Sequence, residues 1–168
     1  MNAQIQLDRQ LEKVIATISA TLKSDGFDRR GKTLRSISEG VSQLIEFQKS
    51  DKSDSQRIRF TVNLGIVCDK LLDAERTTLA KATVEDAHLR TRLGQLLSSP
   101  ADIWWDLTAS TDCDVLAGEL SQLLKMRALP YLSEHGSEKS LIALWESGKS
   151  PGLTAVQRGR LLTELKAG

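Results

Sequence analysis

The chain has 168 residues, 40% of them hydrophobic and 27% charged, which is typical of one ordinary domain with a buried core and excludes a disordered or membrane-embedded chain. Its 23 basic and 22 acidic residues leave a net charge of +1, so no global field draws the protein to nucleic acid or to an anionic membrane. Two cysteines without a CxxC pattern predict neither a disulfide framework nor a zinc site, and we expect no metal and no cofactor. Because no apolar run resembles a signal peptide or a membrane span, the expected compartment is the cytoplasm.

The N-terminal segment predicts an amphipathic helix that ends in a left-handed cap at Gly26. Apolar residues recur there at helical spacing, with charged residues between them. The apolar positions are Leu7, Leu11, Val14, Ile18 and Leu22.

The pattern then changes to the period of two that is typical of strands. Residues 33–38 and 41–49 predict a hairpin with its turn at Glu39-Gly40, and residues 57–68 predict the longest strand. In that strand Ile58, Phe60, Val62, Leu64, Ile66 and Cys68 alternate with a second set of residues that are polar or glycine as far as Gly65, which predicts one face on a core and one face toward water.

Residues 70–84 fit either a short helix or an irregular excursion. Further strands are expected at 87–93 and 103–107. The fold class is therefore α+β, with an N-terminal helix, an antiparallel meander of about five strands, and C-terminal helices.

The last third of the chain predicts helices. Thr111 and Asp114 have the spacing of an N-terminal cap, Pro130 is expected to end or kink the helix that follows, and Ser137 can cap the next one. We expect residues 1–136 to form a single α+β domain and residues 137–168 to form a helical extension packed on the same domain.

Several short motifs, in order and at their spacing, resemble a bacterial family known as domain of unknown function 4304. They span about residues 5–135. The matching residues are Gly26-Phe27 with Gly31 and Thr33, Phe47–Ser50, Phe60–Gly65, Arg90 with Arg92–Gly94, Trp104-Trp105, and Leu129–Leu132. The resemblance implies an α+β domain in a bacterial cytoplasm, and it implies no reaction, cofactor or catalytic residue.

Polar side chains on the outward face of the predicted sheet form the main candidate site. Arginine forks and amides are suited to carboxylates, phosphates and backbone edges, so this face is a candidate binding surface. The alternative is an ordinary solvated sheet face with cross-strand pairs. The candidates are Gln48, Arg59, Asn63, His88, Arg90, Arg92 and Trp104, with Thr61 and Arg35 expected beside them.

Two smaller features have alternative interpretations. The basic run Arg29, Arg30, Lys32 and Arg35 contains no acidic residue and could contact phosphates, although such a run is often a solvated turn. Of the neighbours Trp104 and Trp105, one should lie in the core, because successive strand residues face opposite ways.

Evidence for catalysis in the sequence is thin. Cys113 begins a predicted helix, where a thiolate could be stabilised, but no histidine is near it in sequence. His88 could serve as a general base beside Asp106, or it could be a surface histidine among arginines. Whether the protein is an enzyme stays open at this point, and the pattern favours that it is not.

Three functions are therefore open. The first is a non-enzymatic cytoplasmic domain that binds another protein, as an immunity or accessory factor by analogy of class alone. The second is a polyanion or nucleic-acid binder that uses the arginines of the open sheet face. The third is an enzyme that acts on an anionic substrate. No membrane partner is expected, and the oligomeric state cannot be read from the sequence.

Overall fold

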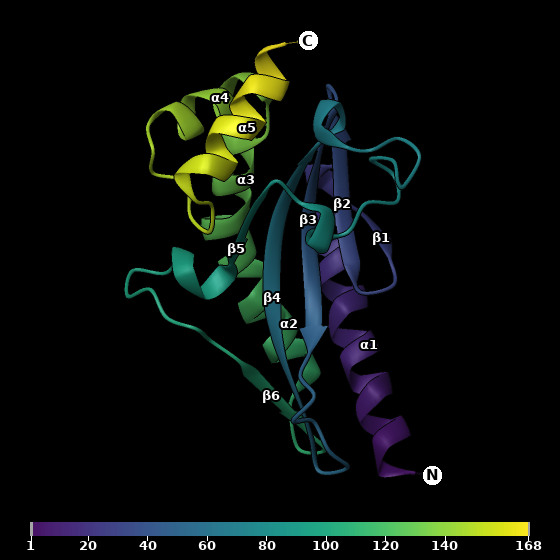
Figure 1. Cartoon of the computed structure of the whole chain (residues 1–168). Helices are drawn as coiled ribbons and strands as arrows, with labels where there is room; N and C mark the ends of the chain where they lie inside the picture. The colour runs from purple at the N-terminus through teal and green to yellow at the C-terminus, as the bar shows by residue number, and fades with distance from the viewer. Residues whose placement is uncertain (1, 168) are drawn as a thin grey trace.

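The structure, a computed structural model, describes residues 2–167 and shows one antiparallel sheet with helices on one of its faces (Figure 1). Helices α1, α2 and α3 lie behind the sheet in that view, and α4 and α5 stack at the end where the chain terminates. The strands are β1 (Asp28–Arg30), β2 (Thr33–Ser38), β3 (Val41–Lys49), β4 (Arg57–Cys68), β5 (Leu89–Arg92) and β6 (Trp105–Thr108). The helices are α1 (Ala3–Leu22), α2 (Cys113–Leu123), α3 (Leu129–His135), α4 (Glu138–Glu146) and α5 (Ala155–Lys166). The α+β fold class is thus confirmed.

The sheet differs from the predicted meander at both edges. Strand β1 was not predicted, because three charged residues are too short a run to show a period. The sheet order is β1-β2-β3-β4-β5, and β6 pairs with β4 instead of with β5. Residues Asn63–Ile66 of β4 pair with β5, and Arg57–Phe60 pair with β6. Strands β5 and β6 therefore share one edge of β4, separated by the excursion at residues 93–104.

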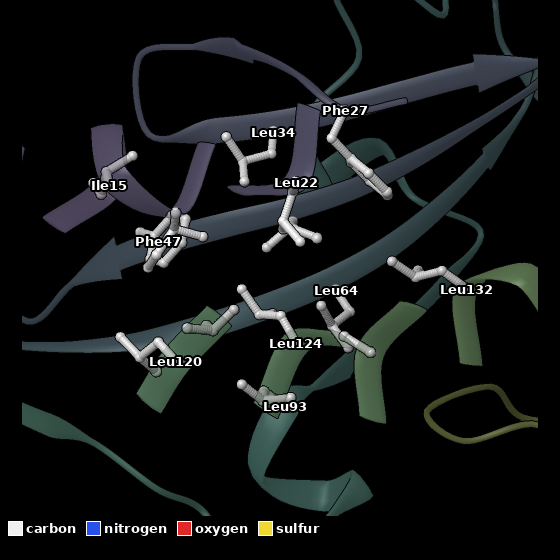
Figure 2. Close-up of a cluster of buried hydrophobic side chains, with 14 of the residues drawn as sticks. Ile15, Leu22, Phe27, Leu34, Phe47, Leu64, Leu93, Leu120, Leu124 and Leu132 are labelled. Atoms are coloured by element: carbon white, nitrogen blue, oxygen red, sulfur yellow. The ribbon is translucent and has the colours of Figure 1, made fainter. Parts of the chain in front are cut away.

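The inner face of the sheet carries the main core. All six alternating residues from Ile58 to Cys68 are fully buried, as their period predicted. Figure 2 shows leucine and phenylalanine side chains from α1, the strands and the later helices converging on one volume. The turn between β2 and β3 is as predicted, with positive φ at Glu39 and Gly40, and Gly26 is left-handed after α1.

The outer face is only partly solvated, which corrects the prediction of one wholly wet face. The segment at residues 69–88, called here the cover segment, crosses in front of the strands (Figure 1). It is irregular apart from short 3₁₀ turns. Its residues Ala82 and Val84 form a second small core with Leu44 and Val67 of the sheet. A Cβ atom at Gly65 would lie 2.9 Å from the Cβ of Ala87, so the missing side chain lets the segment approach.

The helical third begins and bends at different residues from those predicted. Asp112, not Thr111, caps α2, and its carboxylate accepts from the backbone N–H groups of Asp114 and Val115. Pro130 does not end the helix. A π-helical turn over Leu124–Ala128 joins α2 to α3, and Pro130 stands in the first turn of α3, where a missing N–H costs little.

Helices α4 and α5 contribute side chains to the main core. Ser137 caps α4 as predicted, and Leu141 and Trp145 of that helix are buried together with Leu161 and Leu165 of α5. The residues after 136 are thus attached to the same apolar core as the sheet.

Candidate functional site

The uncovered part of the outer sheet face contains an open depression of about 480 Å³, called here the sheet-face depression. Strands β3, β4 and β5 form its floor, the cover segment forms one wall, and the turn after β5 forms another. Four residues proposed from the sequence line it: Gln48, Asn63, Arg90 and Arg92. The structure adds Glu46, Val84, Glu85, Thr91 and Gln95.

The strand register explains why residues far apart in sequence meet here. Asn63 of β4 stands opposite both Glu46 of β3 and Arg92 of β5, so their side chains share a face. The Asn63 amide Nδ2 donates to Gln48 Oε1 at 2.7 Å and to Glu46 Oε1 at 3.0 Å. Its Oδ1 accepts from Arg92 Nε at 3.3 Å. The floor of the depression is therefore a connected network in which the side chains of Glu46, Gln48, Asn63 and Arg92 are bonded to one another through Asn63.

Arg92 is held from the other side by the excursion between β5 and β6. Its guanidinium donates to Asp102 Oδ1 at 2.6 Å and lies 5.3 Å from the centre of the Trp104 ring, a cation–π distance. The indole Nε1 of Trp104 donates to the other oxygen of Asp102 at 3.3 Å. The bond from Arg92, aided by the one from Trp104, lowers the pKa of Asp102 against the opposing effect of burial. Arg92 and Trp104 are thus fixed in place by each other and by Asp102.

A close approach at Gly94 makes this excursion possible. Gly94 O accepts from Ala101 N at 3.1 Å, and a Cβ at Gly94 would lie only 2.2 Å from Ala101 O. No other residue fits at that position without a backbone shift. This close contact turns the chain back toward β4 and places Asp102 and Trp104 next to Arg92. Nothing in the sequence pattern marked Asp102.

Arg90 differs from the other arginines of this face. Its side chain is exposed on the β5 side of the depression, and within residues 2–167 that side chain makes no hydrogen bond or ion pair. Glu85, exposed on the cover segment, is likewise without a partner in that part of the chain. The depression therefore combines a fixed polar floor with one free guanidinium and one free carboxylate.

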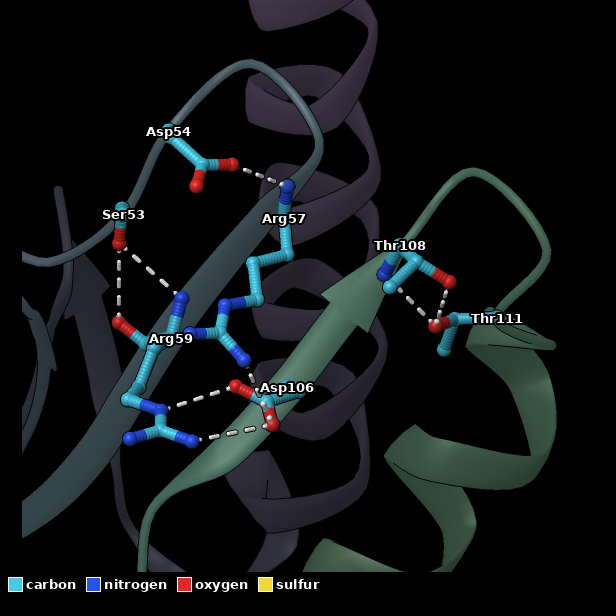
Figure 3. A network of polar contacts seen from close by, with 7 residues as sticks. All are labelled: Ser53, Asp54, Arg57, Arg59, Asp106, Thr108 and Thr111. Carbon is cyan, nitrogen blue, oxygen red and sulfur yellow. Dashed lines mark hydrogen bonds and ion pairs between the residues drawn. The ribbon is translucent and has the colours of Figure 1, made fainter.

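Arg59 does not line the depression, although it shares the same face of β4. Figure 3 shows its guanidinium turned to Asp106, with Nε 3.0 Å from Oδ1 and the second nitrogen 3.4 Å from Oδ2. Arg57 approaches the same carboxylate at 3.8 Å. The bond from Arg59 lowers the pKa of Asp106 and raises that of the guanidinium. Arg59 is thus satisfied within the protein.

His88 also lies apart from the depression, at the end of the cover segment. Its Nδ1 accepts from the backbone N–H of Cys68 at 3.0 Å, so the imidazole joins the two ends of that segment. Burial lowers its pKa, against smaller opposing effects from the Leu71 backbone, Glu164 and Asp86. Its backbone N donates to Ile66 O, seven residues along β4 from the partner of Asp106, a separation of roughly 23 Å at strand spacing. The alternative that placed His88 beside Asp106 as a general base is therefore wrong.

The other residues considered from the sequence are held inside the fold. Thr61 is buried and donates to Ile103 O at 2.8 Å. Trp105 stacks on Phe60 with ring centres 6.0 Å apart, so it is the tryptophan on the core side. Cys68 is buried and its pKa is raised by burial, whereas Cys113 is half-buried at the start of α2.

Residues 2–167 contain no group of three or more histidine, cysteine, aspartate or glutamate residues placed to hold a metal ion. None of the helices described is both long enough and apolar enough to span a membrane.

Comparison with known proteins gives a family and no activity. No curated protein and no solved structure matches the chain. A family model described as a domain of unknown function matches residues 18–134, which is well over half of the chain. The match spans the sheet, the cover segment, the excursion after β5 and the helices up to α3, and so contains the whole sheet-face depression. The protein therefore belongs to the DUF4304 family.

Proposed function

We propose that this protein is a non-enzymatic binding domain of the bacterial cytoplasm that recognises another protein through the sheet-face depression. The observation that carries the proposal is the state of Arg90, a free guanidinium beside a floor whose polar side chains are bonded to one another through Asn63. A guanidinium in this position gains two hydrogen bonds when a partner presents a carboxylate.

The shape and lining favour a protein partner over a small molecule. Sites for small molecules are usually enclosed and mostly apolar. Here Val84 is the one aliphatic residue among the nine that line the depression, and the depression is open. Arginines that become desolvated at the centre of a contact are common hot spots of protein interfaces.

The charges that line the depression indicate which side chains a partner surface should present. Arg90 of β5 and Glu85 of the cover segment both line it and do not pair with each other. A partner that presents an acidic and a basic side chain would satisfy both. Such a mixed pattern suits a protein of net charge +1, which gives little long-range attraction to either sign.

An enzymatic role has weaker support. His88 is the histidine on this face, and its Nδ1 is occupied by the Cys68 amide. Burial, which lowers its pKa, favours the neutral imidazole, and the side chain lines a separate hollow with other residues of the cover segment instead of the sheet-face depression.

The test is affinity purification from the native cell extract, followed by calorimetric titration of the recovered partner against variants. We expect Arg90→Ala to weaken binding at least about tenfold, as for a hot-spot arginine, and Arg90→Lys to recover part of the loss. Arg59→Ala is the matched control, because Arg59 lies on the same sheet face but is satisfied by Asp106. Equal affinity of the wild type and Arg90→Ala would remove the depression as the interface.

A further inference from the structure

A second depression, of about 330 Å³, lies at the opposite edge of the sheet, and we call it the sheet-edge depression. Its position is set by register, because Asp28 of β1 stands opposite Arg35 of β2 and Arg30 opposite Thr33. These side chains share the outer face with Arg90 and Arg92 of β5, which lies three to four strand spacings, or about 14–19 Å, away. It is lined by Gly26, Asp28, Arg29, Arg30, Arg35 and Ile37.

The three arginines of this depression are not equivalent. Arg29 pairs with Glu12 of α1 at 2.5 Å and donates from Nε to Gly31 O at 2.8 Å. Arg30 is exposed and forms no ion pair within residues 2–167. Arg35 donates to Ala82 O of the cover segment, and its Nε is enclosed without an acceptor in the same part of the chain. Arg30 and Arg35 thus keep unused donors.

The side chains that line the sheet-edge depression carry a net positive charge. Arg29 is neutralised by Glu12, which leaves two guanidinium groups and the single carboxylate of Asp28, which makes no ion pair with a described residue. The pKa of Arg35 is lowered first by burial and then by repulsion from the charge of Arg30. An anion that reaches both would relieve this repulsion.

We propose that the sheet-edge depression binds a phosphate group between Arg30 and Arg35. A phosphate offers at least three oxygens and up to two negative charges, and it can serve two guanidinium forks at once, whereas a carboxylate has two oxygens and one charge. Ile37, with 49% of its surface exposed, supplies an apolar wall on which the organic part of a phosphate monoester can rest. The site is independent of the protein-binding proposal, because it shares no residue with the sheet-face depression.

The test is a titration of the ¹⁵N-labelled protein with sodium phosphate at constant ionic strength, followed by amide chemical shifts. The expected result is saturable shifts in residues 26–37 and none in residues 90–95. Adenosine monophosphate in place of phosphate distinguishes an ester from the free ion, since contact with Ile37 should make the ester bind more tightly. Weaker binding of the ester would assign the site to free phosphate, still within the proposal.

For three variants the proposal predicts both the direction and the size of the change in phosphate affinity. We expect Arg30→Gln to weaken phosphate binding at least about tenfold, because it removes a charged fork. Arg29→Gln, in the same depression but neutralised by Glu12, should change it by no more than about twofold. Asp28→Asn should tighten it, because it removes the carboxylate that opposes the anion. The amide spectra also report whether each variant is folded.

Several results would overturn the proposal. One is equal loss of binding in Arg29→Gln and Arg30→Gln, which would indicate a diffuse field instead of a site. Another is acetate binding as tightly as phosphate, which would assign the site to carboxylates. A third is a response only to a single-stranded oligonucleotide, with shifts over both depressions and a steep salt dependence, which would indicate a polyanion surface.

Discussion

The two faces of the sheet are built on different principles although the same strands form them. On the inner face the alternating residues of β4 are all fully buried in one continuous core. On the outer face the small cluster around Leu44 and Val67 lies beside a polar depression, and one irregular segment borders both. The inner face is therefore determined by local periodicity, whereas the outer face depends on how a loop lies across it.

The largest expected effect concerns the inner face. Phe60 is fully buried between Phe47 and Trp105, so Phe60→Ala should lower the free energy of unfolding by about 3–5 kcal/mol. Chemical denaturation measures this. Ile37→Ala on the outer face, where the side chain is half-exposed, is the control and should change stability by less than about 0.5 kcal/mol. A loss below about 1 kcal/mol for Phe60→Ala would contradict the packing.

A smaller effect is expected where the cover segment meets the sheet. In Gly65→Ala the new methyl group would lie 2.9 Å from the Cβ of Ala87, and overpacking of this size costs about 1–3 kcal/mol. Amide hydrogen exchange in residues 82–88 should become faster in this variant. Gly118→Ala in α2 is the control of opposite sign, because the space around Gly118 is open and alanine favours a helix by about 0.5–1 kcal/mol. Unchanged exchange in Gly65→Ala would show that the cover segment does not rest on Gly65.

The free energy of unfolding should vary with pH because of His88 on the outer face. Because burial lowers its pKa in the folded protein, the unfolded chain takes up the proton first, near the ordinary value of 6.5. The contribution to stability is therefore complete above that value and is lost as the pH falls below it, by at most about 1.4 kcal/mol per pH unit.

His88→Asn is the matched variant, because an amide oxygen can still accept from the Cys68 N–H but does not titrate in this range. Between pH 7.5 and 5.5 the wild type should lose more stability than His88→Asn, measured by denaturation at each pH. Parallel pH profiles of the two proteins would show that His88 does not contribute.

The smallest expected effect on stability is at the exposed end of the outer face. Arg59 and Asp106 form an ion pair in which both side chains are partly exposed, so Arg59→Ala should move the melting temperature by no more than a few degrees. Differential scanning calorimetry measures the change. Unfolding of Arg59→Ala would mean that the arginine supports the β4–β6 pairing more than its exposure indicates.

Much of the candidate site could be expected from the alternation of side chains along the strands. Alternation correctly placed Gln48, Asn63, Arg90 and Arg92 on one face, and the register brings them together. It also placed Arg59 and His88 on that face. Neither residue lines the depression. Arg59 pairs with Asp106, which is distant in sequence, and His88 is held at the end of the cover segment, which is irregular. Strand β1 was too short to show a period, and Asp102 lies in an excursion without a pattern.

The sequence by itself determined the elements whose causes are local. Helix α1 follows from its apolar spacing, the β2–β3 turn from Glu39-Gly40, and β4 from its unbroken alternation. Only the tertiary structure decided which arginines remain available, because the contacts that occupy Arg59 and Arg35 join distant parts of the chain. Arg59 pairs with a residue 47 positions away, and Arg35 donates to a carbonyl 47 positions away. Arg90 and Arg30 have no such partner in residues 2–167, and that difference, which no periodicity encodes, is what makes them candidates for binding.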